Sequence, residues 1–107
     1  MDVASLRSPV VRQAIEALNG GRQEDFLALF TPDAVVEDSA TYADAASIRA
    51  WAERENFKAH MHISVRRELD AAGTSLEIKA ASHGGYNGPG TFTFTLQGDK
   101  IAQLVIG

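Results

Sequence analysis

The sequence predicts one small α+β domain in which helices come first and a curved antiparallel sheet follows. Apolar residues recur at helical spacing in the first half of the chain and alternate with polar residues in the second half. The chain has 107 residues, which is enough for one hydrophobic core but not for two. Helices that precede a run of strands are typical of a helical layer packed on one face of a sheet.

Two helices are expected in the first thirty residues. Ser8 and Pro9 mark the first start, because serine caps a helix and proline fits the first helical position. Gly20 and Gly21 end this helix, since glycine adopts the left-handed conformation that closes a helix. A second short helix is expected over residues 23–30, with acidic residues in its first turn.

A short strand, a turn and a third helix are expected next. The strand covers residues 34–38 and the turn covers residues 39–43. Asp44 is placed to cap the third helix, which carries Trp51 on its apolar face and ends near Asn56. The indole N–H of a buried tryptophan needs a hydrogen-bond partner, so Trp51 is also a candidate for contact with a ligand.

From residue 60 onward the pattern changes to strands with alternating apolar residues. The expected strands cover residues 60–69, 76–80, 91–97 and 100–106. Leu69 falls on the inward-facing parity of the first of these strands. The stretch 83–90 is rich in glycine, asparagine and proline and is not expected to be regular strand throughout.

Composition excludes several classes of function. The net charge of −4 and the absence of a Lys/Arg stripe argue against nucleic-acid binding. The chain has no cysteine, so it forms no disulfide and uses no thiolate. It begins without the pattern of a signal peptide and has no apolar run long enough to span a membrane, so we expect a cytoplasmic location.

The three histidines raise the question of a metal site. His60 and His62 lie two apart on an expected strand and share a face, but that face has the polar parity and is expected to be the outer sheet surface. His83 lies in the glycine-rich stretch. No further ligands at suitable spacing are evident, so we expect no metal and no cofactor.

Several segments of the chain resemble one protein superfamily. The string ALNGGRQEDFLALFTPDAVVED, the helix segment Ser47–Trp51 and the final hairpin FTLQGDKIAQLVIG carry the resemblance, which extends over nearly the whole chain. They are similar to the nuclear-transport-factor-2-like superfamily, especially its bacterial ketosteroid-isomerase-like and polyketide-cyclase-like (SnoaL-like) members. The resemblance implies one domain over residues 1–107 with a cone-shaped (cystatin-like) sheet packed on three N-terminal helices. It leaves function open, because this superfamily hosts isomerases, cyclases, dehydratases, hydrolases and non-catalytic domains.

Asp38 is the candidate catalytic residue. The resemblance implies that it matches the aspartate base of ketosteroid isomerases, which moves a proton next to a carbonyl group. Strand alternation places Asp38 on the same face as Val36, toward the expected cavity. The alternative interpretation is that its carboxylate accepts hydrogen bonds from backbone N–H groups in the turn 39–41. Both interpretations stay open.

The other catalytic groups of those isomerases are missing. By the resemblance, Ala14 stands where the first-helix tyrosine belongs, Ala52 replaces a supporting tyrosine, and Phe92 stands near the late-strand carboxyl position. Loss of one such oxyanion donor costs about a hundredfold in rate. Tyr42 and Tyr86 lie in loops and are possible substitute donors.

Three functional hypotheses follow. The first is a SnoaL-like domain that binds a small apolar molecule in an apolar pocket with Asp38 near its floor. The second is an isomerase-type or cyclase-type enzyme that uses Asp38 as general base, and the third is a non-catalytic dimerisation domain with a filled cone. We also expect a homodimer through the outer sheet face. The residues expected to line the cone interior, as core or as pocket wall, are Ala14, Leu18, Phe30, Val36, Trp51, Ile63, Ile78, Phe92, Phe94, Leu104 and Ile106.

Overall fold

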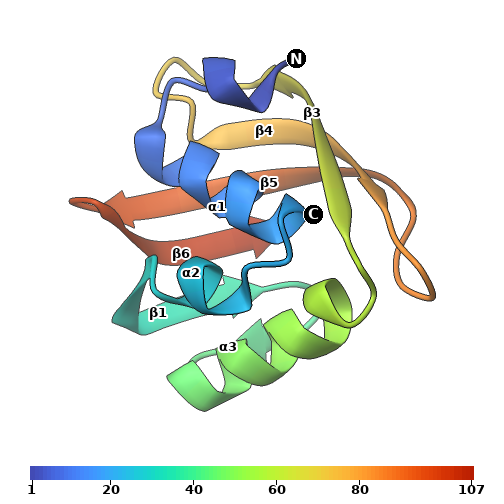
Figure 1. The fold of residues 1–107 in the computed structure, drawn as a ribbon. Coiled ribbons are helices and arrows are strands. Elements are labelled where there is room, and N and C mark those ends of the chain that lie inside the picture. Colours follow the sequence, from blue (N-terminus) through green and yellow to red (C-terminus); the bar gives the residue numbers. More distant parts are fainter.

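Three helices lie on one side of a six-stranded sheet in the computed structural model, which describes residues 1–107 (Figure 1). A 3-10 turn (Val3–Ser5) precedes α1, and a π-helical turn, η2 (Glu53–Phe57), continues α3. The predicted α+β class is confirmed. The helices are α1 (Pro9–Asn19), α2 (Gln23–Leu27) and α3 (Ala45–Ala52), and the strands are β1 (Phe30–Glu37), β2 (Thr41–Tyr42), β3 (His62–Glu68), β4 (Ser75–Ala81), β5 (Gly88–Gln97) and β6 (Lys100–Ile106).

The strands are arranged in the order β2-β1-β6-β5-β4-β3. Strands β3 to β6 form an antiparallel meander, because each is joined to the next by a hairpin. Strand β1 pairs with β6 in parallel. One pair of the sheet is therefore parallel, whereas an antiparallel sheet was expected. This direction is possible because β1 and β6 are joined through α3 and the whole meander rather than by a tight turn.

The ends of the helices follow local capping signals. The Ser8 hydroxyl accepts a hydrogen bond from the Val11 N–H at 3.3 Å, and Pro9 takes the first helical position. The Asp44 carboxylate accepts from the Ser47 N–H at 2.7 Å and caps α3. The predicted start of α1 and the predicted cap of α3 are confirmed.

Helix α2 is shorter than predicted, because sheet pairing overrides helix formation after Leu27. The Leu29 carbonyl accepts from the Ile101 N–H of β6 at 2.7 Å, and Phe30 pairs with the same residue. This pairing draws the chain into β1 at Phe30, so the expectation of helix up to residue 30 was wrong.

Two strand predictions also need correction. In β3 the pairing register shifts after Val65, and this shift reverses the inside–outside alternation beyond it. Glu68 therefore turns inward, with 10% of its side chain exposed, whereas Leu69 is 46% exposed instead of buried. Strand β5 begins at Gly88, three residues earlier than predicted, because Gly88–Gly90 pair with β4.

Polar contacts tie the N-terminal segment to strand β3, which lies at an edge of the sheet. The Asn19 side chain donates from Nδ2 to the Ile63 carbonyl at 2.9 Å and accepts from the Ile63 N–H at 2.7 Å. The N-terminal ammonium group of Met1 donates to the Val65 carbonyl at 2.7 Å. These bonds occupy backbone groups that an edge strand otherwise leaves open to other chains.

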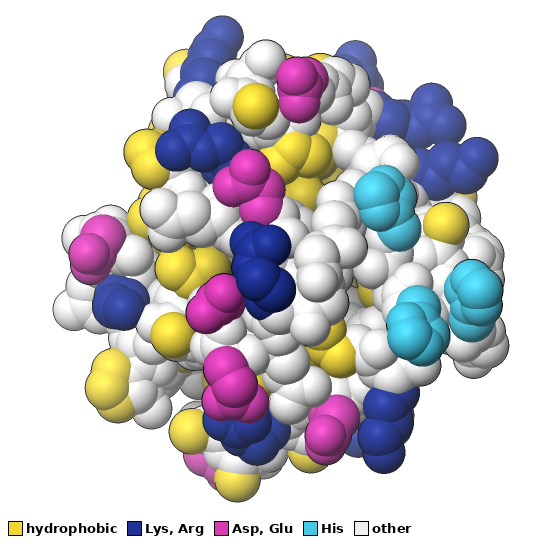
Figure 2. Space-filling model, viewed as in Figure 1, with side chains coloured by type: hydrophobic (Ala, Val, Ile, Leu, Met, Phe, Trp, Pro, Cys, Tyr) yellow, Lys and Arg dark blue, Asp and Glu magenta, His cyan; other side chains and the backbone are white.

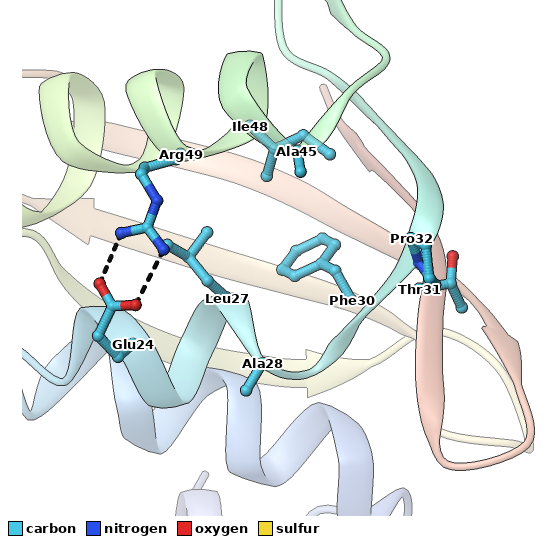
Figure 3. A pocket seen from close by; sticks show the side chains of 9 residues that line it. All are labelled: Glu24, Leu27, Ala28, Phe30, Thr31, Pro32, Ala45, Ile48 and Arg49. Carbon is cyan, nitrogen blue, oxygen red and sulfur yellow. Dashed lines mark hydrogen bonds and ion pairs between the residues drawn. The ribbon is translucent and has the colours of Figure 1, made fainter.

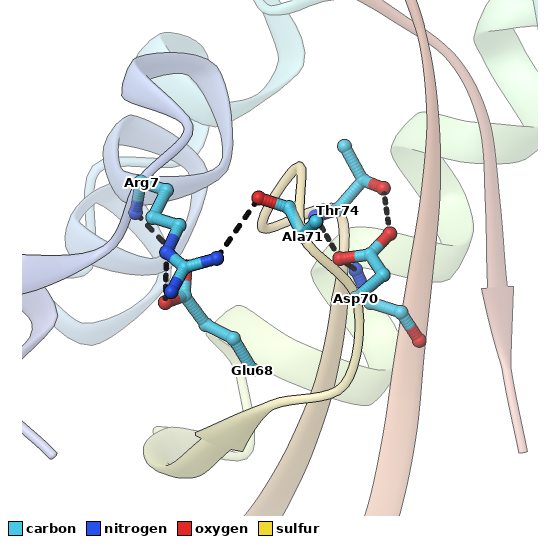
Figure 4. A network of polar contacts seen from close by, with 6 residues as sticks. Arg7, Glu68, Asp70, Ala71 and Thr74 are labelled. Carbon is cyan, nitrogen blue, oxygen red and sulfur yellow. Dashed lines mark hydrogen bonds and ion pairs between the residues drawn. The ribbon is translucent and has the colours of Figure 1, made fainter.

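A second polar network holds the β3–β4 hairpin (Figure 4). Arg7 donates from its backbone N–H to the Glu68 carboxylate and from its guanidinium to the Ala71 carbonyl. Asp70 accepts from the hydroxyl and the backbone N–H of Thr74, and the hydroxyl bond chiefly holds the pKa of Asp70 below its usual value. The hairpin is thus fastened to the segment that leads into α1.

Replacement of Asn19 tests the edge contact. Asn19→Ala removes both partners of Ile63 and should lower the free energy of unfolding by about 2 kcal/mol, the usual cost of unpaired backbone groups at a partly buried position. Asn19→Asp keeps an acceptor for the N–H but places a carboxylate oxygen against the Ile63 carbonyl, so it should also be destabilising. Urea denaturation measures both. An Asn19→Ala variant as stable as the wild type would contradict this role.

Candidate functional site

Asp38 lies directly after β1 and is bound to α3 through Trp51. Its Oδ2 atom accepts a hydrogen bond from Trp51 Nε1 at 3.0 Å, and the Trp51 side chain is buried. Backbone N–H groups of the turn 39–41 do not bond to the carboxylate. Instead the Asp38 N–H donates to the Ala40 carbonyl at 2.9 Å. The turn is therefore held by backbone atoms, and the carboxylate is left to face the indole.

The Asp38 carboxylate is half-buried and is not neutralised by a cation. It forms no ion pair, and its second oxygen, Oδ1, has no hydrogen-bond donor within the chain. A neutral N–H donor fixes the direction of the group without cancelling its charge. One carboxylate oxygen therefore remains free to accept a proton or a hydrogen bond.

Aromatic side chains surround Trp51. Phe26 packs against it with ring centroids 6.4 Å apart, and Tyr42 from β2 packs at 6.2 Å. Phe26 also contacts Phe30 and Phe57, at 5.1 Å and 5.8 Å. Edge-to-face and tilted contacts at these distances are favourable, so the aromatic cluster fixes the indole that holds Asp38.

The two candidate loop donors, Tyr42 and Tyr86, lie in different parts of the structure. Tyr42 lies in the aromatic cluster, and its hydroxyl accepts from the Arg54 guanidinium at 3.1 Å, so its own proton remains free to donate. The Arg54 guanidinium also lies over the ring, 5.8 Å from the centroid. Tyr86 lies in the β4–β5 hairpin, where its hydroxyl donates to the Pro89 carbonyl. Only Tyr42 shares the neighbourhood of Asp38.

No polar donor stands at the positions of the missing isomerase groups. Ala14 and Ala52 are fully buried, and Phe92 is 4% exposed. All three belong to the hydrophobic core. Any donor to a ligand near Asp38 must therefore come from elsewhere in the chain.

Most of the residues expected to line the cone interior lie in the packed core. All of them are buried except Phe30 and Ile106, which are half-buried and pack against the same core. The four principal pockets of the structure lie outside this core. Among the residues expected to line the cone interior, Phe30, Leu18 and Ile106 each line one of these pockets. None of these pockets is lined by Asp38.

An apolar groove with a volume of about 320 Å³ lies between α2, β1 and α3 (Figure 3). Its apolar walls are Leu27 from α2, Phe30 from β1 and Ile48 from α3. Arg49 reaches across one side and bonds to the Glu24 carboxylate at 2.6 and 2.9 Å, and these bonds keep the pKa of Glu24 below its usual value. Sequence reasoning missed this groove, because it depends on two helices that meet only in the folded chain.

The histidines gather on one face of the molecule (Figure 2). His60 and His62 are exposed, and the His83 ring lies 5.9 Å from that of His60, centroid to centroid. No group of three or more histidine, cysteine or acidic side chains is arranged to hold a metal ion. No helix is long and apolar enough to cross a membrane.

The family model for the SnoaL-like domain matches residues 11–104. The chain belongs to the SnoaL-like domain family. This family fits the nuclear-transport-factor-2-like superfamily that the sequence motifs resemble. No match is found among the curated proteins.

Solved structures of this SnoaL-like fold are similar over nearly the whole chain. A protein of Sinorhizobium meliloti described as a polyketide cyclase has 22% identity and a TM-score of 0.84, and 100% of each chain is covered. The Delta 5-3-ketosteroid isomerase of a Mycobacterium species has 16% identity and a TM-score of 0.70, with 96% of this chain and 92% of that chain covered. A protein of Mycobacterium tuberculosis, RV0760c, in complex with estradiol-17beta-hemisuccinate has 13% identity and a TM-score of 0.71, with 91% of this chain and 88% of that chain covered. Identities this low establish a shared fold alone.

Substitutions at Asp38 test the contact with Trp51. Asp38→Ala leaves the buried indole N–H without an acceptor and should lower the free energy of unfolding by about 2 kcal/mol. Asp38→Asn keeps an acceptor oxygen and should cost clearly less. The matched control is Asp99→Ala, in the exposed turn between β5 and β6. Urea denaturation followed by fluorescence compares the three, and equal stability of Asp38→Ala and Asp99→Ala would rule out the contact.

Proposed function

We propose that this SnoaL-like domain binds a small, mostly apolar molecule that carries a polar group for Asp38. The observation that carries the proposal is the Asp38–Trp51 hydrogen bond of 3.0 Å. It holds an unneutralised carboxylate in a fixed direction beside an aromatic cluster and leaves one oxygen unbonded. A carboxylate oxygen that has no donor within the chain is available to accept a hydrogen bond from a ligand.

The groove between α2, β1 and α3 supports the same proposal. Its volume of about 320 Å³ falls in the range of small-molecule sites, and apolar side chains form most of its walls. Ile48 of the groove lies one turn before Trp51 on the buried side of α3. Phe30 contacts Phe26, which in turn contacts Trp51. The apolar part of a ligand in the groove would thus lie one aromatic layer from the Asp38–Trp51 pair, and under the proposal its polar group extends past this layer to the carboxylate.

The names of three similar structures guide the choice of the first ligands to test. The first is a ketosteroid isomerase, the second contains a steroid ester, and the third is a designed binder of 17-OHP. These names describe those proteins. For this chain they motivate a panel of apolar ketones that includes steroids.

The binding experiment uses the single tryptophan of the chain as reporter. Each ketone is titrated while Trp51 fluorescence and the melting temperature are followed. A ligand present at one hundred times its Kd should stabilise the fold by about 2.7 kcal/mol. Ile48→Ala and Asp38→Asn should each weaken binding, whereas Asp99→Asn should not. A panel that changes neither the fluorescence nor the melting temperature would contradict the proposal.

A second candidate function is proton transfer next to a carbonyl group, with Asp38 as general base. The position of Tyr42 favours it, because this phenol packs against Trp51 and keeps its proton free to donate to an oxyanion. Under this candidate, Asp38→Asn would abolish turnover of a bound ketone and Tyr42→Phe would reduce it strongly. Ligand binding that survives Asp38→Asn with no turnover in the wild type would leave a binding domain only.

We also propose a homodimer formed through the outer sheet face. The helices cover the opposite face, so the outward side chains of β3, β4 and β5 have no layer packed on them. Thr93 and Thr95 lie exposed near the middle of this face. Light scattering at micromolar concentration should give twice the chain mass, and Thr93→Arg should return it to the monomer value. A monomeric wild type would refute the dimer.

A further inference from the structure

Two histidines from distant segments of the sequence meet on the surface of the fold. His60 lies between η2 and β3, and His83 lies in the hairpin between β4 and β5. Their rings are 5.9 Å apart from centroid to centroid, with planes inclined by 63°. Both side chains are exposed, and the histidines gather on the face shown in Figure 2. We call these two residues the histidine pair.

This pair differs from the one that the sequence indicated. Alternation placed His60 and His62 on one face of a strand, but β3 begins only at His62. His60 instead has a backbone φ of 51°, which is the left-handed region and lies outside the strand pattern. No ring contact joins His62 to either member of the pair. The fold therefore makes His83, and not His62, the neighbour of the His60 ring.

Backbone contacts fix the two segments that carry the pair against each other. The His83 N–H donates to the carbonyl of Ala59, the residue directly before His60, at 2.7 Å. Ala59 is buried, and Gly85 packs on it so closely that an added Cβ at Gly85 would lie 3.1 Å from the Cβ of Ala59. The backbone thus brings the two imidazoles together without help from a ligand.

The imidazole nitrogens of the histidine pair are not used within the chain. No hydrogen bond or ion pair involves the side chain of His60 or His83. A neutral imidazole carries one free nitrogen lone pair and is the commonest metal ligand in proteins. Residues 56–67 and 78–98 contain no aspartate or glutamate. Nitrogen ligands without carboxylates suit Zn²⁺, Cu²⁺ and Ni²⁺, whereas Mg²⁺ and Ca²⁺ require oxygen ligands.

The separation of the two rings is close to that of two ligands on one ion. Zn–N bonds of about 2.0–2.1 Å at a tetrahedral angle place the centroids of two bound imidazoles about 5 Å apart. The observed separation is 5.9 Å, so a shift of about 1 Å between the two rings completes the geometry. Exposed side chains change rotamer rapidly, so a shift of this size requires no change of the backbone.

We propose that the histidine pair binds a divalent transition-metal ion, for which Zn²⁺ is the probe. Each imidazole supplies one nitrogen, and water fills the remaining positions of the ion. No third histidine, cysteine or acidic side chain is arranged to join them, so the affinity is lower than that of a closed structural zinc site. The bound ion joins the loop before β3 to the β4–β5 hairpin. This site is independent of the ligand proposed for Asp38.

A titration of the tag-free protein with Zn²⁺ tests the site. The readouts are the imidazole 15N signals of the three histidines and the melting temperature. The signals of His60 and His83 should shift in a saturable manner, while those of His62 stay in place. Zn²⁺ should also raise the melting temperature, because it binds the folded chain in which the two rings are together. Mg²⁺ should change neither readout.

Single substitutions identify the ligands. His60→Gln and His83→Gln should each weaken Zn²⁺ binding by about tenfold or more, because loss of either imidazole removes the chelate. The matched control is His62→Gln, which removes an exposed imidazole from the same face and should bind Zn²⁺ like the wild type. All three positions are exposed, so the metal-free variants should melt close to the metal-free wild type.

Three results would overturn the proposal. The first is an absence of shifts at His60 and His83 at millimolar Zn²⁺. The second is a loss of affinity in His62→Gln as large as that in His83→Gln, which would assign the ion to His60 and His62 instead. The third is wild-type affinity in His83→Gln, which would mean an adventitious ion only. None of these results bears on Asp38, because the reporters lie in a different part of the fold.

Discussion

The hydrogen bond between Asp38 and Trp51 joins the end of β1 to α3, and the proposed ligand site depends on it. The indole needs an acceptor because it is buried, and the carboxylate needs a donor because it lies at the margin of an apolar core. Each group satisfies the other without an ion pair. Phe26 and Tyr42 pack on the indole and fix its plane, so the direction of the carboxylate is set by the aromatic cluster rather than by the exposed turn that follows β1.

Local signals account for the parts of the fold that the sequence predicted well. Ser8 caps α1, Asp44 caps α3, and the last strand covers residues 100–106 as expected. These features depend on neighbours within a few residues. The errors lie where distant segments decide the outcome. Pairing of Phe30 with Ile101 shortens α2, and the register shift after Val65 turns Leu69 outward. Helix propensity and the alternation of apolar residues do not indicate which strand pairs with a given segment.

The same distinction applies to the candidate sites. Asp38 was identifiable as the last residue of an expected strand, and Trp51 by an indole that needs a partner. Their pairing is a tertiary contact across 13 positions. The groove depends on Arg49 and Glu24, which are 25 residues apart. His60 was expected to share a strand face with His62. Its ring meets His83 instead, because β3 begins only at His62 and the β4–β5 hairpin packs beside the preceding loop. Sequence therefore predicts candidate groups, and packing decides which of them meet.

The central claim is that the Asp38 carboxylate is bonded to the Trp51 indole in solution. The most direct measurement is the indole N–H cross-peak in a 15N-correlated NMR spectrum, which is a single peak because the chain has one tryptophan. Asp38→Ala, which removes the acceptor, should shift this peak, whereas Asp99→Ala should leave it in place. An indole peak that Asp38→Ala does not move would contradict the hydrogen bond.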